Sequence, residues 1–437
     1  MRHLSSLTER ILTFPLPRKP PKYVVPIIIF VLYFVISPLV VPHRVVKIGE
    51  LTRLALLGLF VLDIFHRRQK IPSFGLTLIF LSFMFFSDLT HGNIAAGFNP
   101  RLIAGYAFHI LGNTSIGLII LLQFYTRSWD HLIESLKVLV LAITITCSLI
   151  GFYQMATGEK LADFSMVAEG GQYLEETGRL TSLTGGGAAT LTLACLGLLG
   201  ALFFLKRKRG IILSLFAING LAMIMTFSRG SYVAFTAMII AGILLLVRTW
   251  HVKMRKKIKY AIVILLIGAI FAFIFFFIGF PYLLESQEIE RFRSPANILA
   301  RIEWWRLSLD IIDNYVLTGI GLRADLASEF WKYTFVYKTP HNFIIAWIMQ
   351  MGLVFAMIIL FMVLRQLFHL FNYLRRPLSS SIYWVGFSLA ISYIGVLVAS
   401  LGGSDSLHYV LLMAALTNAY LKLAPTVGRA PVAKSFR

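Results

Sequence analysis

Long apolar runs alternate with short polar segments along the whole chain of 437 residues. By length and hydropathy these runs predict about twelve helical spans, each long enough to cross a hydrocarbon core about 30 Å thick. The predicted spans cover residues 23–41, 48–65, 72–89, 102–124, 132–155, 182–205, 211–227, 231–249, 259–283, 342–364, 383–401 and 406–424. The pattern favours an all-α polytopic membrane protein, with residues 1–437 forming a single integral membrane domain.

Basic residues are distributed unevenly among the segments that connect the predicted spans. Clusters at 67–70, 206–209 and 375–376, like those of both terminal segments, fall in alternate connections. Because cytoplasmic loops of membrane proteins are enriched in lysine and arginine, we expect these connections and both termini to be cytoplasmic. This topology explains the net charge of +21, which therefore does not indicate a nucleic acid partner.

Composition agrees with a membrane protein. The chain is 58% hydrophobic and 14% charged, whereas soluble domains carry about 25% charged residues. The two cysteines, Cys147 and Cys195, lie inside predicted spans, so no disulfide framework is expected. The sequence has no HExxH motif, no Cys pair and no paired carboxylates at metal-ligand spacing, which predicts an activity that needs no metal or other cofactor.

One connection on the side opposite to the basic clusters is long. Residues 284–341, between the ninth and tenth predicted spans, are too polar for a span and too rich in aromatic residues for a linker. Within the stretch 300–315, apolar residues recur at helical spacing: Ile302, Trp305, Leu309 and Ile312. We therefore expect an external helix that Arg301 opens and that ends before the turn residues Gly319 and Gly321.

Several arginines lie on this outer side, against the bias of the basic residues. They are Arg179, Arg229, Arg291, Arg293, Arg301, Arg306 and Arg323. Arg229 lies in TFSRGSY, a tight turn between two spans, where an isolated charge is costly. Arg301 is expected at a helix start, where the helix dipole disfavours a cation and favours an anion. Because the guanidinium fork suits phosphate, these arginines are candidate ligands of an anionic headgroup; snorkelling to lipid phosphates or plain solvent exposure is the alternative.

A histidine and an asparagine stand at the start of the tenth predicted span, in YKTPHNFIIAW. Pro340 is typical of a helix start, so we expect His341 in the first helical turn, facing the outer compartment. The helix dipole there favours the neutral imidazole, which can accept a proton as a general base. We expect Asn342 to cap the helix or to orient the histidine.

Four segments in this order resemble the O-antigen ligase branch of a bacterial superfamily that also contains O-antigen polymerases and protein O-oligosaccharyltransferases. The segments are GRLTSLTGGGAATLTLACL at 178–196, TFSRGSYVAF at 226–235, ARIEWWRLSLDIIDNYVLTGIGL at 300–322 and HNFIIAWIMQMGLVFA at 341–356. The resemblance covers roughly residues 178–355, and the first segment lacks the Pro-Asn pair often seen in the family.

The resemblance implies a membrane glycosyltransferase of the GT-C-like type in the bacterial inner membrane, with a periplasmic active site. Its donor would be O-antigen polysaccharide on undecaprenyl diphosphate, and its acceptor a sugar hydroxyl of lipid A-core, so that transfer completes lipopolysaccharide. The transfer would be metal-independent and would invert the anomeric centre. Membrane lipids would surround the protein. His341 would be the catalytic base. The expected substrate-binding residues are Arg229, Arg301, Arg179, Asn342, Arg306 and Arg323.

Three other functions are compatible with the sequence. A polymerase of the same superfamily would use the same residues with a glycan acceptor. A protein O-oligosaccharyltransferase would use a serine hydroxyl, and such enzymes usually carry a larger outer domain. A transporter of lipid-linked glycans would need arginines without a base, and its polar residues should line a path at mid-membrane, whereas here they gather at one face.

Overall fold

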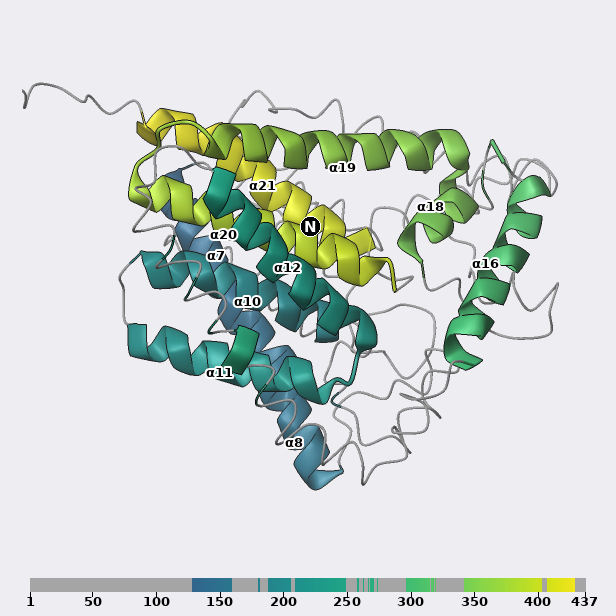
Figure 1. Cartoon of the computed structure of the whole chain (residues 1–437), viewed down its shortest axis with the longest axis horizontal. Helices are drawn as coiled ribbons and strands as arrows, with labels where there is room; N and C mark the ends of the chain where they lie inside the picture. The colour runs from purple at the N-terminus through teal and green to yellow at the C-terminus, as the bar shows by residue number, and fades with distance from the viewer. Residues whose placement is uncertain are drawn as a thin grey trace, which may run out of the picture.

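The computed structural model describes residues 128–158, 188–205, 209–248, 296–314, 342–402 and 407–428, together with single residues between these ranges such as Leu180 and Gly319. Every element of the described residues is a helix, and none of them is a strand (Figure 1). In chain order the helices are α7 (Trp129–Ile143), η2 (Thr144–Leu149), α8 (Ile150–Thr157), α10 (Ala188–Phe204), α11 (Arg209–Met225), α12 (Arg229–Arg248), α16 (Ala296–Asn314), α18 (Phe343–Met351), α19 (Leu353–Leu374), α20 (Ser380–Ser400) and α21 (Leu407–Gly428).

Four helical stretches among the described residues are long and apolar enough to cross a membrane. They are Trp129–Thr157, Arg229–Arg248, Leu353–Leu374 and Ser380–Ser400. Two further apolar helices, α10 and α11, have 17 residues each. The first four predicted spans and most of the ninth lie outside the described residues, so the all-helical class is confirmed while the count of twelve stays a prediction.

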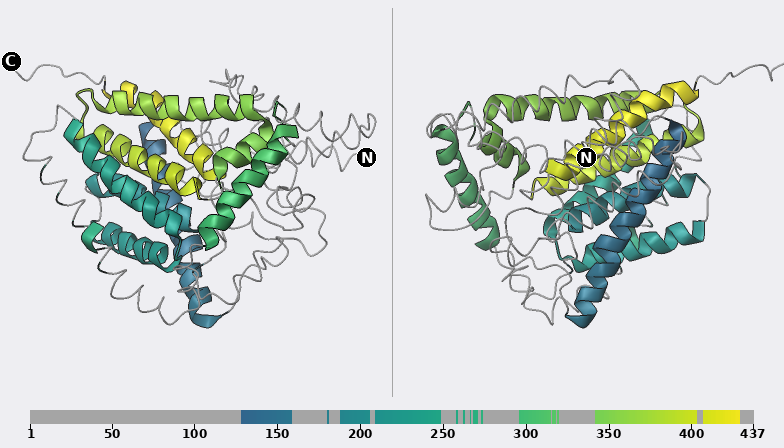
Figure 2. Two further views of the ribbon diagram at one scale, coloured as in Figure 1. Left: turned by 45° about the vertical axis from the view of Figure 1, so that its right-hand side comes forward. Right: turned by 180° about the vertical axis from the view of Figure 1, so that it is seen from behind.

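Helix α20 lies at the centre of the bundle. It packs against α10 and α12 on one side and against α19 and α21 on the other, an arrangement that Figures 1 and 2 show from three directions. Small residues allow the closest of these contacts, because a Cβ at Gly197 of α10 would overlap Ser392 Oγ of α20. Ser392 Oγ in turn donates a hydrogen bond to the Ala194 carbonyl at 3.2 Å. Small residues and interhelical hydrogen bonds are typical of helix packing in membranes.

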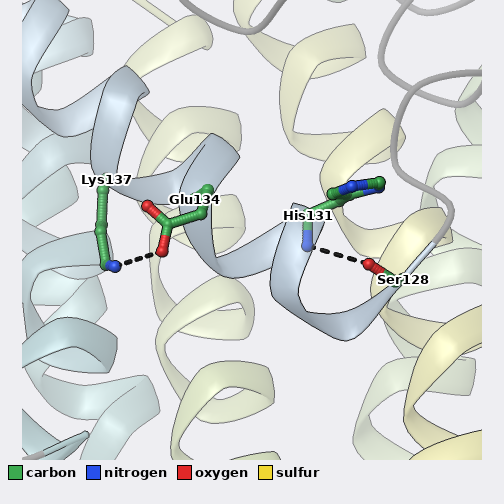
Figure 3. Close-up of polar contacts among 4 residues, drawn as sticks. All are labelled: Ser128, His131, Glu134 and Lys137. Carbon is green, nitrogen blue, oxygen red and sulfur yellow. Dashed lines mark hydrogen bonds and ion pairs between the residues drawn. The ribbon is translucent and has the colours of Figure 1, made fainter. Parts of the chain in front are cut away.

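Local polar contacts fix the start of the first described membrane helix. Ser128 is the N-cap of α7, and its Oγ accepts a hydrogen bond from the His131 amide at 3.2 Å. Glu134 and Lys137 form an ion pair one turn later (Figure 3). The amides of the first helical turn have no partner within the helix, and the Ser128 side chain accepts a hydrogen bond from one of them. A serine at this position is therefore a sequence signal for a helix start.

The tenth predicted span, 342–364, is divided into two helices. Helix α18 ends before Gly352, whose φ of 79° lies in the left-handed region, and α19 begins immediately after it. The Leu353 amide donates to the Val316 carbonyl at 2.7 Å, so the segment that follows α16 binds at this break. The apolar run continues through the break, and hydropathy therefore could not locate it. The helix that is long and apolar enough to cross a membrane starts at Leu353 rather than at residue 342.

Gly319 is expected to be the least replaceable glycine at this junction. Its φ is +67°, and an added Cβ would lie 2.5 Å from the Gln350 carbonyl group and from the Gly352 nitrogen. Gly319→Ala should therefore destabilise the protein by about 2–5 kcal/mol, the sum of the left-handed cost and overpacking against backbone that cannot yield. Thermal unfolding of the purified protein in detergent measures this loss.

Gly158→Ala is the matched control for that variant. Gly158 has a φ of +71°, but nothing lies within 4 Å of its added Cβ, so alanine there carries only the backbone cost of about 1–2 kcal/mol. Equal destabilisation by the two variants would contradict the close contact of Gly319 with the α18–α19 break.

Candidate functional site

The turn that carries Arg229 is tight and capped. Phe227 has a φ of 47°, unusual for a bulky residue, and its side chain is buried. The Ser228 carbonyl accepts hydrogen bonds from the amides of Ser231 at 3.0 Å and Tyr232 at 3.2 Å, and Ser228 Oγ accepts from the Ser231 amide at 3.4 Å. Arg229 is thus the first residue of α12, as the predicted turn requires. A cation gains nothing from the positive end of a helix dipole, whereas an anion there would be stabilised.

Arg301 reaches the same turn from α16. A Cβ built on Gly402 would lie 3.7 Å from Arg301 Nη1 and 3.9 Å from Gly230 Cα. The Arg301 guanidinium and the backbone of Gly230, the residue after Arg229, therefore both lie close to Gly402. Figure 2, left, shows the N-terminal part of α16 next to the start of α12. The side chain of Arg301 and the turn that carries Arg229 thus meet near Gly402, at the junction of α12, α16 and α20.

The C-terminal end of α20 completes this junction. The same Cβ on Gly402 would lie 3.5 Å from the Ala399 carbonyl oxygen, and a Cβ on Gly230 would lie 3.8 Å from it. The last carbonyls of a helix carry a partial negative charge, which favours a nearby cation. The end of α20, with its partial negative charge, therefore lies close to the Gly230 turn at the start of α12.

The predicted position of Arg301 at the opening of its helix is wrong. Helix α16 begins at Ala296, so Arg301 lies in its second turn. The argument from the helix dipole therefore does not apply to Arg301, and it applies to Arg229 instead. The sequence could not place the start because the residues before Arg301 are also compatible with a helix.

The predicted apolar face of the external helix is also wrong in part. Ile302 and Leu309 are 52% and 54% exposed, whereas Ile312 is buried as expected. The buried face contains Ile311 and Ile312, which pack with Ala346 and Met349 of α18. Apolar residues occur on several sides of α16, so their spacing alone could not select the face that α18 covers.

Asn342 caps α18. Its Oδ1 accepts hydrogen bonds from the amides of Ile344 at 3.0 Å and Ile345 at 3.3 Å, which confirms the predicted capping. The helix begins at Phe343, two residues later than the expected start at His341. His341 itself lies outside the described residues. Because α18 packs on α16, the segment that follows His341 belongs to the same structural unit as Arg301.

The other predicted arginines differ in what is known of their surroundings. Arg179 and Arg323 lie outside the described residues, and Arg306 is exposed on α16. Leu180, which follows Arg179, is buried, and its amide donates to the Met225 carbonyl at the end of α11 at 3.0 Å. The chain next to Arg179 is therefore attached close to the turn that leads to Arg229.

Gly402 and Ala399 are the residues at this junction that sequence reasoning missed. The Gly-Gly pair after α20 is a recognisable helix stop, but its proximity to Arg301 depends on packing between distant segments. Among the described residues, no group of three or more His, Cys, Asp or Glu side chains could hold a metal ion. The metal-independent activity stays a prediction.

Residues 212–361 match the sequence model of the family described as O-Antigen ligase. The match includes most of α11, all of α12, α16 and α18, and the first part of α19, and hence both Arg229 and Arg301. No curated protein and no solved structure matches the chain. The family supports an enzyme of the O-antigen ligase or polymerase type, glycosyltransferase-like and acting on lipid-linked polysaccharide. The match supports membership of the O-antigen ligase superfamily, and together with the apolar helices it suggests an integral membrane protein.

Proposed function

We propose that the protein transfers O-antigen polysaccharide from undecaprenyl diphosphate to a sugar hydroxyl of lipid A-core, at the periplasmic face of the inner membrane. The observation that carries this proposal is the meeting of Arg301 with the turn of Arg229 at the start of α12. A helix that begins with one arginine and has the guanidinium of a second arginine near its start suits a diphosphate, because charge-assisted bonds and the helix dipole can act on the same anion. Arg179, Arg306 and Arg323 would add to this binding.

The proposed reaction is a single displacement at the anomeric carbon of the donor. The acceptor hydroxyl forms the new carbon–oxygen bond, the bond from the anomeric carbon to the phosphate oxygen breaks, and the configuration inverts. Undecaprenyl diphosphate departs with the bonding electrons, so negative charge grows on the phosphate. Arginines at this position stabilise the transition state more than the ground state, which is what accelerates a reaction.

His341 would take the proton of the acceptor hydroxyl. The support for this role is its position directly before the Asn342 cap of α18, the helix that packs on the helix of Arg301. A general base must lie within hydrogen-bond reach of the proton it removes, so its backbone needs a fixed position relative to the arginines. Asn342 would serve this purpose by holding the start of α18.

Reconstitution tests the proposed function and separates it from its relatives. The purified protein in proteoliposomes should convert lipid-linked O-antigen and rough lipopolysaccharide into a ladder of conjugates, resolved on a gel. A polymerase would instead lengthen the glycan on its lipid carrier, and a protein O-oligosaccharyltransferase would need an acceptor protein. Movement of the lipid-linked glycan across the bilayer without any new covalent product would indicate a transporter and would contradict the proposal.

The proposed topology gives an accessibility experiment. Cysteines at Ser294 and Ser328, in the loop expected to be periplasmic, should react with a membrane-impermeant thiol reagent in cells with a permeabilised outer membrane. A cysteine at Gly210, at the expected cytoplasmic start of α11, should not react, although nothing lies within 4 Å of an added Cβ there. The native cysteines are buried and contribute little background. Labelling at Gly210 would contradict the topology.

A further inference from the structure

Helix α16 meets the ends of three helices that are long and apolar enough to cross a membrane. A Cβ built on Gly402, just after the end of α20, would lie 3.7 Å from Arg301 Nη1 of α16 and 3.9 Å from Gly230 Cα at the start of α12. Beyond the other end of α16, the Val316 carbonyl accepts a hydrogen bond from the amide of Leu353, the first residue of α19. Figure 2, left, shows α16 running across α12 and α20 rather than along them. The helix therefore lies at the level of one membrane boundary and follows the membrane surface.

One edge of α16 is apolar and exposed. Ile302 and Leu309, seven residues apart, are each more than half exposed. Because an α-helix turns by about 100° per residue, their side chains project within about 20° of each other. Trp305, which is partly buried, and Ile312, which packs on α18, both project to one side of these two residues. We call Ile302 and Leu309 the apolar edge of α16; it borders the face that the rest of the protein covers.

Charged side chains border the apolar edge on its other side. By the same helical geometry, Arg306 and Asp313 project about 40° from the two residues of the apolar edge, and Glu303 and Asp310 project about 100° from them. All four charged residues are exposed. Going around the helix, the protein-covered face is therefore followed by the apolar edge and then by the charged face. This order is expected for a helix that lies at the boundary between lipid and water.

A lipid surface fits the apolar edge better than another protein does. A stable protein interface takes roughly 20–30 residues from each side, far more than the two side chains of this edge. Lipid, in contrast, surrounds a membrane protein at the level where its spans end, and there it can cover an edge of any length. The neighbouring side chains suit this surrounding, because tryptophan such as Trp305 is enriched at membrane boundaries and arginine such as Arg306 can extend its guanidinium to lipid phosphates.

We propose that α16 is an interfacial helix that inserts Ile302 and Leu309 into the bilayer, at the boundary between phospholipid headgroups and acyl chains. The partner is the phospholipid surface of the leaflet that contains the start of α12 and the end of α20. This inference needs no step of the proposed function. Insertion also holds Arg301, the residue before Ile302, at the level of the headgroups, where a lipid diphosphate lies; this consequence alone rests on the proposed function.

Spin labels in a reconstituted bilayer test the insertion without any substrate. Single nitroxide-labelled variants Ile302→Cys, Leu309→Cys, Glu303→Cys and Asp310→Cys are compared for collisions with oxygen, which concentrates in lipid, and with an aqueous nickel chelate. The ratio of oxygen to nickel collisions should be about threefold or more higher at 302 and 309 than at their neighbours 303 and 310. Val233→Cys, at an exposed position of α12, is the lipid-facing reference. The unmodified protein, whose native cysteines are buried, gives the background.

Two outcomes of this experiment would overturn the proposal. Frequent nickel collisions at all four positions would place the whole exposed side of α16 in water, and rare collisions with both reagents at 302 and 309 would show that protein, such as a second copy of the chain, covers the edge. Should a labelled variant fail to reconstitute, the rate of thiol modification in membranes opened to both compartments replaces it. Ile302→Cys should then react about tenfold more slowly than Glu303→Cys with a charged reagent, and equal rates overturn the proposal. Neither measurement uses glycan transfer, so a failure of the proposed function leaves both results valid.

Discussion

Replacing His341 by alanine is expected to lower glycan transfer about 100-fold or more, the usual scale for a general base, while donor binding persists. Donor binding should persist because the arginines that hold the diphosphate remain in place. His341→Gln keeps hydrogen-bonding ability but has no basicity, so it should be nearly as inactive as His341→Ala. The measurement is conjugate formation in membranes, normalised to the amount of protein.

The His341 series separates a base from an orienting residue. If His341 only orients the substrate or supports the cap of α18, His341→Gln or His341→Asn should retain most activity, because either can donate and accept hydrogen bonds. His369→Ala, at an exposed position of α19, is the control for removing a histidine from the bundle and should transfer normally. Substantial transfer by His341→Gln would contradict the assignment as base.

Arg301 and Arg229 should show the second large effect. Removing either guanidinium by alanine should lower transfer about 30- to 1000-fold, which corresponds to about 2–4 kcal/mol of lost stabilisation of the departing diphosphate. Arg301→Lys retains the charge but loses the planar fork, so it should still impair transfer. Steady-state transfer at saturating acceptor, with the lipid-linked donor varied, measures both binding and the chemical step.

Arg248→Ala is the matched control for these variants. It removes an exposed arginine at the opposite end of α12, so it tests whether any loss of positive charge on this helix impairs the enzyme. Its transfer rate should equal that of the unmodified protein. If well-expressed Arg229→Ala and Arg301→Ala proteins transferred at wild-type rates, the proposed role of these two arginines in transfer would be wrong.

Local features of the site could be predicted from the sequence, because they depend on residues close along the chain. The turn before α12 follows from Ser228 and Gly230, and the start of α18 follows from the capping ability of Asn342. Gly319 was predicted as a turn residue, and its positive φ confirms that prediction. Periodicity and capping are short-range signals, so they found elements and their ends.

Features that depend on distant segments could not be predicted in this way. The break at Gly352 exists together with a hydrogen bond from Leu353 to Val316, which the uninterrupted apolar run does not reveal. The proximity of the Arg301 guanidinium to Gly402 relates two segments that no local pattern connects.

The helix α16 shows how a correct element can carry a wrong detail. Its existence and its end before Gly319 were predicted, but its start and its buried face were not. Apolar residues on several sides made Ile302 and Leu309 equivalent to the residues that α18 actually covers. Packing against α18 determines which face of α16 is buried. The same packing orients α16 so that Arg301 points toward α12 and α20.

The central claim is that Arg229 and Arg301 bind the lipid diphosphate. Direct binding of undecaprenyl diphosphate to the purified protein tests it. Native mass spectrometry or a competition assay can compare the unmodified protein with the Arg229→Ala, Arg301→Ala and His341→Ala variants. We expect the unmodified protein and His341→Ala to bind with the same affinity, and both arginine variants to bind about 30-fold or more weakly. Equal affinity in all four proteins would contradict the account.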